Sequence, residues 1–275
     1  MKRQLPYEIS YTLLKRCRSI ETVLLWITLV IPIILVTIPY IVVNGRNCTD
    51  LFNILSYISI ISYALLYIIV EIIMQPMVAS SRRKGFIDNS LGSHFLNKPV
   101  TNYYDNDTIS LGPYKMLVNC FENCFFTYNL VKATLLKKVI FNFLLFLILA
   151  FLAFYGIRNH SFAIPFLQLF LSSSIFMEVV FHIVFYFRLS SLYEKFKFFF
   201  SQTKVSKKEI IQEAFFMVLE YESTLAYNKS EISDAVYKKM NLELTEEWNN
   251  MKILYKIKID NEKIYNGECV KRTSR

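Results

Sequence analysis

Two long apolar runs in the second half of the chain constrain its fold more than any other feature. Residues 139–157 (VIFNFLLFLILAFLAFYGI) carry no charged side chain, and a second, predominantly apolar run at residues 162–187 follows after a four-residue break. A helix needs about 20 mostly apolar residues to cross roughly 30 Å of hydrocarbon, and its backbone must satisfy its own hydrogen bonds there. A buried hairpin of a soluble protein is the alternative, but soluble helices keep a polar stripe that these runs lack. The two runs therefore predict a transmembrane hairpin at residues 139–187.

A second pair of apolar runs precedes this hairpin. Residues 22–45 and 51–74 are each long enough to span a membrane, and a short polar stretch separates them. Gln75-Pro76 is predicted to end the second run, because proline interrupts the hydrogen-bond ladder of a helix. The sequence thus predicts four transmembrane helices in two hairpins, the first of them at residues 22–75.

The positive charges fall on one side of such a topology. The protein is 54% hydrophobic, with a mean hydropathy of +0.33, yet it carries a net charge of +9. Residues 1–21, 76–138 and 188–275 hold 29 of its 31 lysines and arginines. Because basic segments stay on the cytoplasmic side of a membrane, both termini and the middle segment are predicted to be cytoplasmic.

The cytoplasmic regions show helical patterns. A helix is predicted over about residues 114–138, with Pro113 in its first turn. Ser206 and Glu209 have the spacing of a capping box, and short helices are expected at residues 233–240 and 245–256. After the capping box, apolar residues recur at helical intervals; they are Ile210, Ile211, Ala214, Phe215, Val218 and Leu219.

The predicted fold class is an all-α membrane protein. Its basic N-terminus is cytoplasmic (residues 1–21), and a cytoplasmic insert (residues 76–138) separates the two hairpins. A mainly helical cytoplasmic region (residues 188–275) follows the second hairpin.

Motifs that carry chemistry are absent from the sequence. It contains no phosphate-binding GxxxxGK[ST] or GxGxxG loop, no HExxH and no G-x-S-x-G, so we expect neither an enzyme, nor a metal site, nor a cofactor. Its five cysteines are scattered and odd in number, which favours reduced structural thiols over a disulfide framework.

Three ionisable residues lie within the predicted spans. Glu178 and His182 are four residues apart in the fourth span and share one helix face. A charge at that depth costs about 2.5–3.5 kcal/mol on insertion scales, so such side chains line a pathway or join helices. Glu71 lies near the cytoplasmic end of the second span, where it either lines the same zone or reaches the interface. Pore lining and a structural role both stay open for these residues.

Basic and aromatic clusters lie next to the predicted spans. Arg82, Arg83 and Lys84 match a cluster that binds anionic headgroups, and a role in binding a nucleotide phosphate is the alternative. A phenylalanine-rich segment (Phe196, Phe198, Phe199 and Phe200, with Lys195 and Lys197) is predicted to lie in the headgroup region rather than to stack on RNA. The net positive charge is therefore attributed to topology, and no nucleic-acid partner is expected.

Several stretches resemble one bacterial protein family. They are RRKGFIDNSLGSHF, NYYDND and YKMLVNCFENCFFTYNL within residues 82–130, then LEYESTLAYN and ISDAVYKKMNLELTEEW after the last predicted span. This pattern is similar to that of the SMODS-and-SLOG-associating four-helix membrane effectors, which act as pore-forming effectors. The resemblance covers about residues 20–255, and its order of hairpin, insert, hairpin and tail agrees with the predicted topology.

The resemblance implies an abortive-infection effector of antiviral defence in the bacterial inner membrane. A nucleotidyltransferase encoded nearby would make a cyclic nucleotide that controls the effector, and the effector would then permeabilise the membrane. By matching position, the insert of the family includes Asp88, Asn89, Tyr103, Tyr104, Asn106, Lys115 and Glu122. Whether these residues bind the messenger or fold the insert stays open, as does whether the messenger opens or closes the protein.

A homo-oligomer is expected, because four helices are too few for a wide aqueous pore in one copy. A housekeeping channel or transporter is one alternative function, although the chain has only six glycines and no clear internal repeat. A membrane adaptor that binds a partner through residues 188–275 is another.

Overall fold

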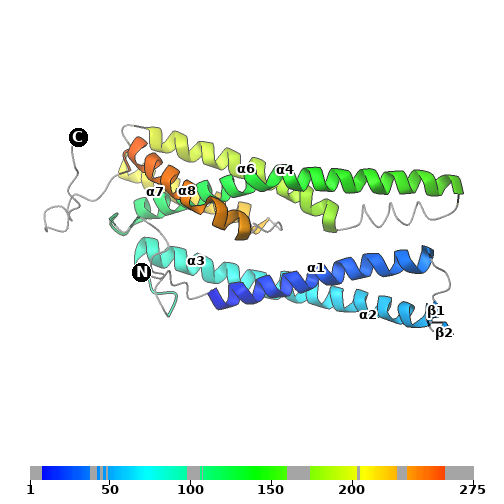
Figure 1. The fold of residues 1–275 in the computed structure, drawn as a ribbon. Coiled ribbons are helices and arrows are strands. Elements are labelled where there is room, and N and C mark those ends of the chain that lie inside the picture. The colour runs from blue at the N-terminus through cyan, green and yellow to red at the C-terminus, as the bar shows by residue number, and fades with distance from the viewer. Residues whose placement is uncertain are drawn as a thin grey trace. The chain divides into compact units, whose positions relative to one another are not determined.

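The structure is a computed structural model that describes residues 8–37, 42–43, 46–47, 49–97, 106, 108–159, 174–202, 205–227 and 234–257. The regular secondary structure of these residues is helical, apart from one pair of two-residue strands, which confirms the predicted all-α class. The chain forms two compact units (Figure 1). Unit 1 comprises residues 1–88 and 94–103, and unit 2 comprises residues 89–93 and 104–275. The predicted insert is thus divided between the two units.

Unit 1 is a helical hairpin with an extended second arm. Helix α1 (Glu8–Thr37) packs beside α2 (Thr49–Ile68), and the short antiparallel pair β1 (Val42–Val43) and β2 (Arg46–Asn47) lies between them in sequence (Figure 1). Leu14, Val70 and Val78 form a buried cluster; Cys17, Leu66 and Met74 pack against it. The cluster joins α1 to the second arm.

The second arm does not end at Gln75-Pro76, so that prediction was wrong. A π-helical turn, η1 (Ile69–Met74), follows α2 and leads directly into α3 (Gln75–Leu91). In an α-helix the ring of Pro76 would meet the carbonyl of Ile72, four residues earlier. The wider turn relieves this clash, since Gln75 N–H bonds to Val70 O, five residues back. The helix therefore passes the proline instead of stopping.

One helix among the described residues, Asp50–Leu91, is long and apolar enough to cross a membrane. Only 11% of its most apolar window is buried within the protein. Large exposed side chains surround it, among them Leu51, Ile54, Ile58, Ile61, Leu65, Ile68 and Ile72. Such an exposed apolar surface suits lipid contact better than a soluble core. The other three spans stay predictions.

Unit 2 is built on a single long helix. Helix α4 (Pro113–Asn159) begins at the predicted proline and continues through residues 139–157 without a break. Helix α6 (Ser174–Ser201) covers the later part of the predicted fourth span, and the start of that span lies outside the described residues. Helices α7 (Lys207–Ala226) and α8 (Asp234–Leu254) pack on α4, and α8 replaces the two short helices that the sequence predicted.

An aromatic cluster forms the core of unit 2. The ring of Phe121 in α4 stacks on Phe196 and Phe200 in α6, with centroid distances of 5.2 and 5.1 Å. Trp248 in α8 meets Phe121 edge-on at 5.2 Å. Stacked and edge-to-face pairs of this kind add to the free energy of burial.

The predicted headgroup location of the phenylalanine-rich segment is therefore wrong for three of its four residues. Phe196, Phe199 and Phe200 are buried, and Phe198 is 70% exposed. The segment is apolar enough for a membrane interface, but α4 and α8 offer aromatic side chains that cover it within the protein.

Helix α7 starts at the predicted capping box. Ser206 Oγ accepts the Glu209 N–H, and the Glu209 carboxylate accepts the Ser206 N–H. The predicted inner face of the helix is only partly right. Ala214 is buried, but Ile211, Phe215 and Leu219 are exposed, because the face that packs inward runs through Ala214, Met217, Tyr221 and Thr224.

Replacing Ser206 with alanine is expected to lower the stability of unit 2 by about 1 kcal/mol, the usual loss for an N-cap. The bond from the Ser206 backbone and that from its side chain lower the pKa of Glu209. Since the folded pKa lies below the unfolded one, this carboxylate stabilises the fold above its ordinary pKa and loses that effect as the pH falls through the lowered value. In denaturant titrations the difference in stability between the parent and Ser206→Ala should therefore become smaller in acid. It should not vanish, because the bond from Glu209 N–H to Ser206 Oγ does not depend on the charge of the carboxylate.

Candidate functional site

A buried polar network lies where α3 ends and α4 begins. Asn106 Nδ2 donates to Asn119 Oδ1 at 2.8 Å and to Glu122 Oε2 at 2.6 Å. Asn119 Nδ2 in turn donates to Asn89 Oδ1 at 2.9 Å and to Ser90 Oγ at 3.1 Å. Ser90, Asn106, Asn119 and Glu122 are all buried. The network therefore joins the last turn of α3, the segment around Asn106 and the first turns of α4.

Local sequence positions these side chains. Lys115, Asn119 and Glu122 follow each other at i, i+4 and i+7, so they lie on one face of α4. Gly92 (φ +72°) ends α3 in the left-handed conformation, and a Cβ there would lie 2.6 Å from Leu111 Cδ1. Gly112 N–H donates to Ser90 O at 2.9 Å. The two glycines thus place the last turn of α3, at Ser90, next to the start of α4.

The network holds a polar atom without a partner. Asn106 is 1% exposed, and its Oδ1 has no hydrogen-bond partner in the described part of the chain. A buried acceptor in that state costs free energy until a donor reaches it. Glu122 and Lys115 lie close by on α4 and are buried too. Chemically, the network is able to accept a hydrogen bond from a ligand or a water molecule.

The other insert residues are placed separately. The Asp88 carboxylate accepts the backbone N–H groups of Phe95 and Leu96, both at 2.8 Å, and so folds the turn after α3. Arg82 and Arg83 are half-buried on α3, and Lys84 is exposed there. Tyr103 and Tyr104 lie outside the described residues.

The ionisable residues of the predicted spans lie in the two different units. Arg18 of α1 donates to Glu71 Oε1 at 3.1 Å and to Gln75 Oε1 at 3.0 Å. The side chains of Arg18 and Glu71 are 15% and 19% exposed, so the ion pair is largely shielded from solvent. Glu71 thus joins α1 to the π turn.

His182 lies between two helices of unit 2. It is fully buried on α6, and its Nε2 is 3.1 Å from Thr134 Oγ1 and 3.3 Å from Val131 O, both on α4. This is the position that a role in joining helices requires. The side chain of Glu178, one turn earlier, is outside the described part of the structure.

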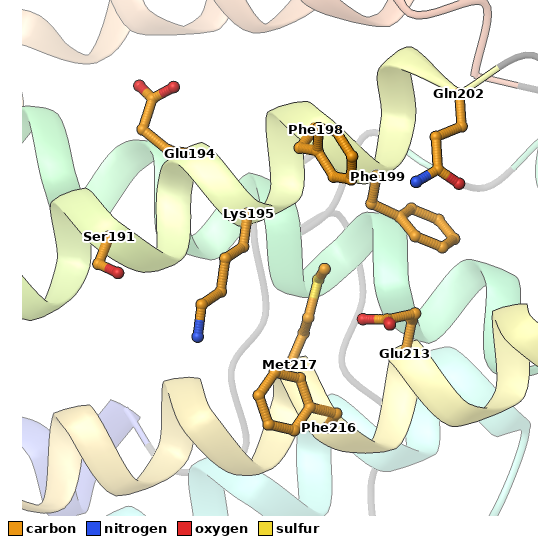
Figure 2. A pocket seen from close by; sticks show the side chains of 9 residues that line it. All are labelled: Ser191, Glu194, Lys195, Phe198, Phe199, Gln202, Glu213, Phe216 and Met217. Carbon is orange, nitrogen blue, oxygen red and sulfur yellow. The ribbon is translucent and has the colours of Figure 1, made fainter.

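A shallow groove of about 430 Å³ separates part of α6 from α7 (Figure 2). Its lining is Ser191, Glu194, Lys195, Phe198, Phe199, Gln202, Glu213, Phe216 and Met217. Lys195 Nζ lies 5.1 Å from the centre of the Phe216 ring, while Glu194 pairs with Lys197 instead. Aromatic faces, one lysine, one amide and the carboxylates of Glu194 and Glu213 therefore share a volume that fits a small ligand.

Thiol and phenol groups around the core are not set up for reaction. Burial raises the pKa of the Cys124 thiol, which keeps it protonated and unreactive. Burial also raises the pKa of Tyr193 to about 12. Within the described residues there is no group of three or more His, Cys, Asp or Glu that could hold a metal ion.

Sequence reasoning missed two central residues. Asn119 connects both halves of the network, and its spacing from Lys115 and Glu122 within an apolar helix was a usable signal. Arg18 was counted only as a topological charge, because no local pattern links it to Glu71, 53 positions away. A comparison of the chain with protein-family models, curated proteins and solved structures finds no match.

Proposed function

We propose that this protein is a multi-pass effector of the bacterial inner membrane that permeabilises the membrane when its cytoplasmic part binds a nucleotide messenger. In this proposal four helices cross the bilayer in two hairpins and both termini are cytoplasmic. The function in antiphage defence, and the nucleotidyltransferase that supplies the messenger, come from the family resemblance. The protein has no catalytic role and acts by rearranging its helices.

The observation that carries the proposal is the helix Asp50–Leu91, whose first part, α2, is apolar and exposed and whose last part, α3, is polar. Its α2 part exposes large aliphatic side chains, whereas α3 carries Arg82, Arg83 and Lys84. A basic cluster directly after an apolar span is typical of a cytoplasmic membrane boundary. In this proposal the same helix carries the chain from the membrane into the cytoplasm.

The groove between α6 and α7 supports the messenger as ligand. A nucleotide needs an aromatic face for its base, a cation for its phosphate and hydrogen-bonding groups for its base edges. Phe216, Lys195 and the pair Gln202 and Glu213 offer these groups in one place (Figure 2). The buried network at Asn106 is a second place with an acceptor to offer.

Permeabilisation requires more than one copy. A bundle of four helices fills its own interior with side chains, so an aqueous path forms between copies rather than within one. We therefore propose a homo-oligomer, with Glu178 and His182 at or near its interior in the active state. In the present structure His182 is buried against Thr134. Helix α6 would therefore have to move against α4 to reach the active state.

Release of a self-quenching dye from liposomes that contain the purified protein tests the proposal. Adding cyclic di- and trinucleotides is expected to start leakage, and Lys195→Ala is expected to weaken the response at least about tenfold, because a charged hydrogen bond is worth about 1.5–3 kcal/mol. Lys208→Ala is the matched control, since Lys208 is exposed on α7 and does not line the groove. Ile61→Lys with Leu65→Lys should abolish insertion, at about 2.5–3.5 kcal/mol for each buried charge.

Other results would point to other functions. Recovery of the parent protein from the soluble fraction of cells would contradict the membrane proposal. Uptake of a particular solute without leakage or growth arrest would favour a channel or transporter. Recruitment of a partner to the membrane, with neither effect, would favour an adaptor, for which the exposed apolar residues Ile211, Phe215 and Leu219 of α7 offer a binding surface.

A further inference from the structure

The π turn η1 lies at the junction between the lipid-suited helix α2 and the polar helix α3. Four apolar residues of this arm face α1, and they are spaced four apart: Leu66, Val70, Met74 and Val78. In an α-helix each step of four residues advances about 40° past a full turn, so three steps would turn the stripe by roughly 120°. A π turn holds one extra residue and sets the helix back by roughly 100°. The stripe stays on α1 because the turn is there.

Two features hold the turn in this register. Pro76 lacks an N–H and would clash with the Ile72 carbonyl in an α-helix, which favours the wider turn. Arg18 binds Glu71 inside the turn and Gln75 just after it. Return to a regular α-helix would turn Val78 and Gln75 away from Leu14 and Arg18. A register without the π turn would differ from the present one by about a quarter of a rotation.

The far end of α3 is held by the polar network. Asn89 and Ser90, in its last turn, accept from Asn119, and Ser90 O accepts from Gly112. Helix α3 contains no break between these contacts and the π turn. The same helical arm therefore carries the π turn at one end and these contacts at the other.

We propose that η1 is a register switch, in which α3 couples the Asn89–Ser90–Asn119 contacts to the membrane hairpin of unit 1. The present register, with Arg18 on Glu71 and Gln75, is the resting state. When the polar network loosens, α3 rotates about its own axis. This rotation breaks the hydrogen bonds of Arg18 to Glu71 and Gln75. That the switch controls permeabilisation rests on the function proposed above. The existence of the switch does not depend on that function.

Disulfide formation between paired cysteines tests the switch. The first pair, Leu14→Cys with Val78→Cys, joins α1 to the part of the arm that follows the π turn. In this protein Cys17, Cys48 and Cys269 are changed to serine. The control pair, native Cys17 with Leu66→Cys, lies before the turn, in a chain with only Cys48 and Cys269 changed. Cys120 and Cys124 stay, because both are buried. Membranes carrying each protein are oxidised and the crosslinked fraction is measured over time.

Pro76→Ala and Asn119→Ala are each expected to slow the 14–78 crosslink at least about fivefold, because cysteines with Cα atoms more than about 7 Å apart do not bridge. The 17–66 crosslink should stay unchanged. Arg18→Gln is a second variant that should act like Pro76→Ala. An unchanged 14–78 rate in Pro76→Ala and Arg18→Gln would overturn the switch, and an unchanged rate in Asn119→Ala would overturn its coupling to the network. Neither readout depends on leakage, so failure of the proposed function is seen separately.

Discussion

Replacing Phe196 with alanine is expected to destabilise unit 2 by about 3–5 kcal/mol, the range for large aromatic truncations in protein cores. Phe196 is fully buried and stacks on Phe121 with an interplanar angle of 13°. Helices α6 and α8 both pack on Phe121, so the cavity left by the ring cannot close without moving one of them. Denaturant unfolding measures the loss, followed by the fluorescence of Trp248 in a Trp26→Phe background.

Phe198→Ala is the matched control for this prediction. It changes the same residue type two positions further along α6, where the side chain is 70% exposed. Its expected effect is within about 0.5 kcal/mol, as for ordinary surface positions. If the two variants lost equal stability, the aromatic cluster would not be the core, and the headgroup location that the sequence favoured would be restored.

These two phenylalanines show where sequence reasoning succeeds and where it ends. Apolar runs and capping spacings are local patterns, so the helices from Pro113, from Ser206 and along Leu51–Met74 could all be predicted. Phe196 and Phe198 have the same local surroundings, and only the position of Phe121 on a distant helix separates them. Burial against a partner element depends on tertiary packing, which the local pattern does not contain.

Pro76 shows a different limit. Proline usually ends a helix, so local sequence patterns predict that the helix ends at Pro76. The cost of continuing is offset by the contacts of Arg18, Glu71 and Gln75 and by the packing of Val70 and Val78 on α1. The candidate site follows the same logic, since Asn89, Asn106 and Glu122 were predicted to act in one insert, but Asn119, which links them, was not.

Asn119→Ala is expected to have the second largest effect, because Asn119 exchanges hydrogen bonds with three other residues of the network. Without it the buried Ser90 hydroxyl loses this donor, and Asn106 Nδ2 loses one of its two acceptors. Each buried polar group left without a partner costs about 1–3 kcal/mol. Thermal unfolding of the purified protein in detergent measures the change, with Asn129→Ala as the control. Among the residues that the structure describes, the amide of Asn129 bonds within its own helix, to Phe125 O, and the residue is half-buried, so that variant should be nearly neutral.

The same pair of variants separates two roles for the network. If the network folds the insert, Asn119→Ala lowers the baseline unfolding temperature, and cyclic nucleotides raise that temperature in the parent and in the variant alike. If the network itself binds the messenger, the ligand stabilises the parent by RT ln(1 + [L]/Kd) and does not stabilise the variant. We expect the first result. Its physical reason is that all five network side chains hydrogen-bond to one another. Among the buried side-chain atoms of the network that the structure describes, Asn106 Oδ1 alone lacks a partner.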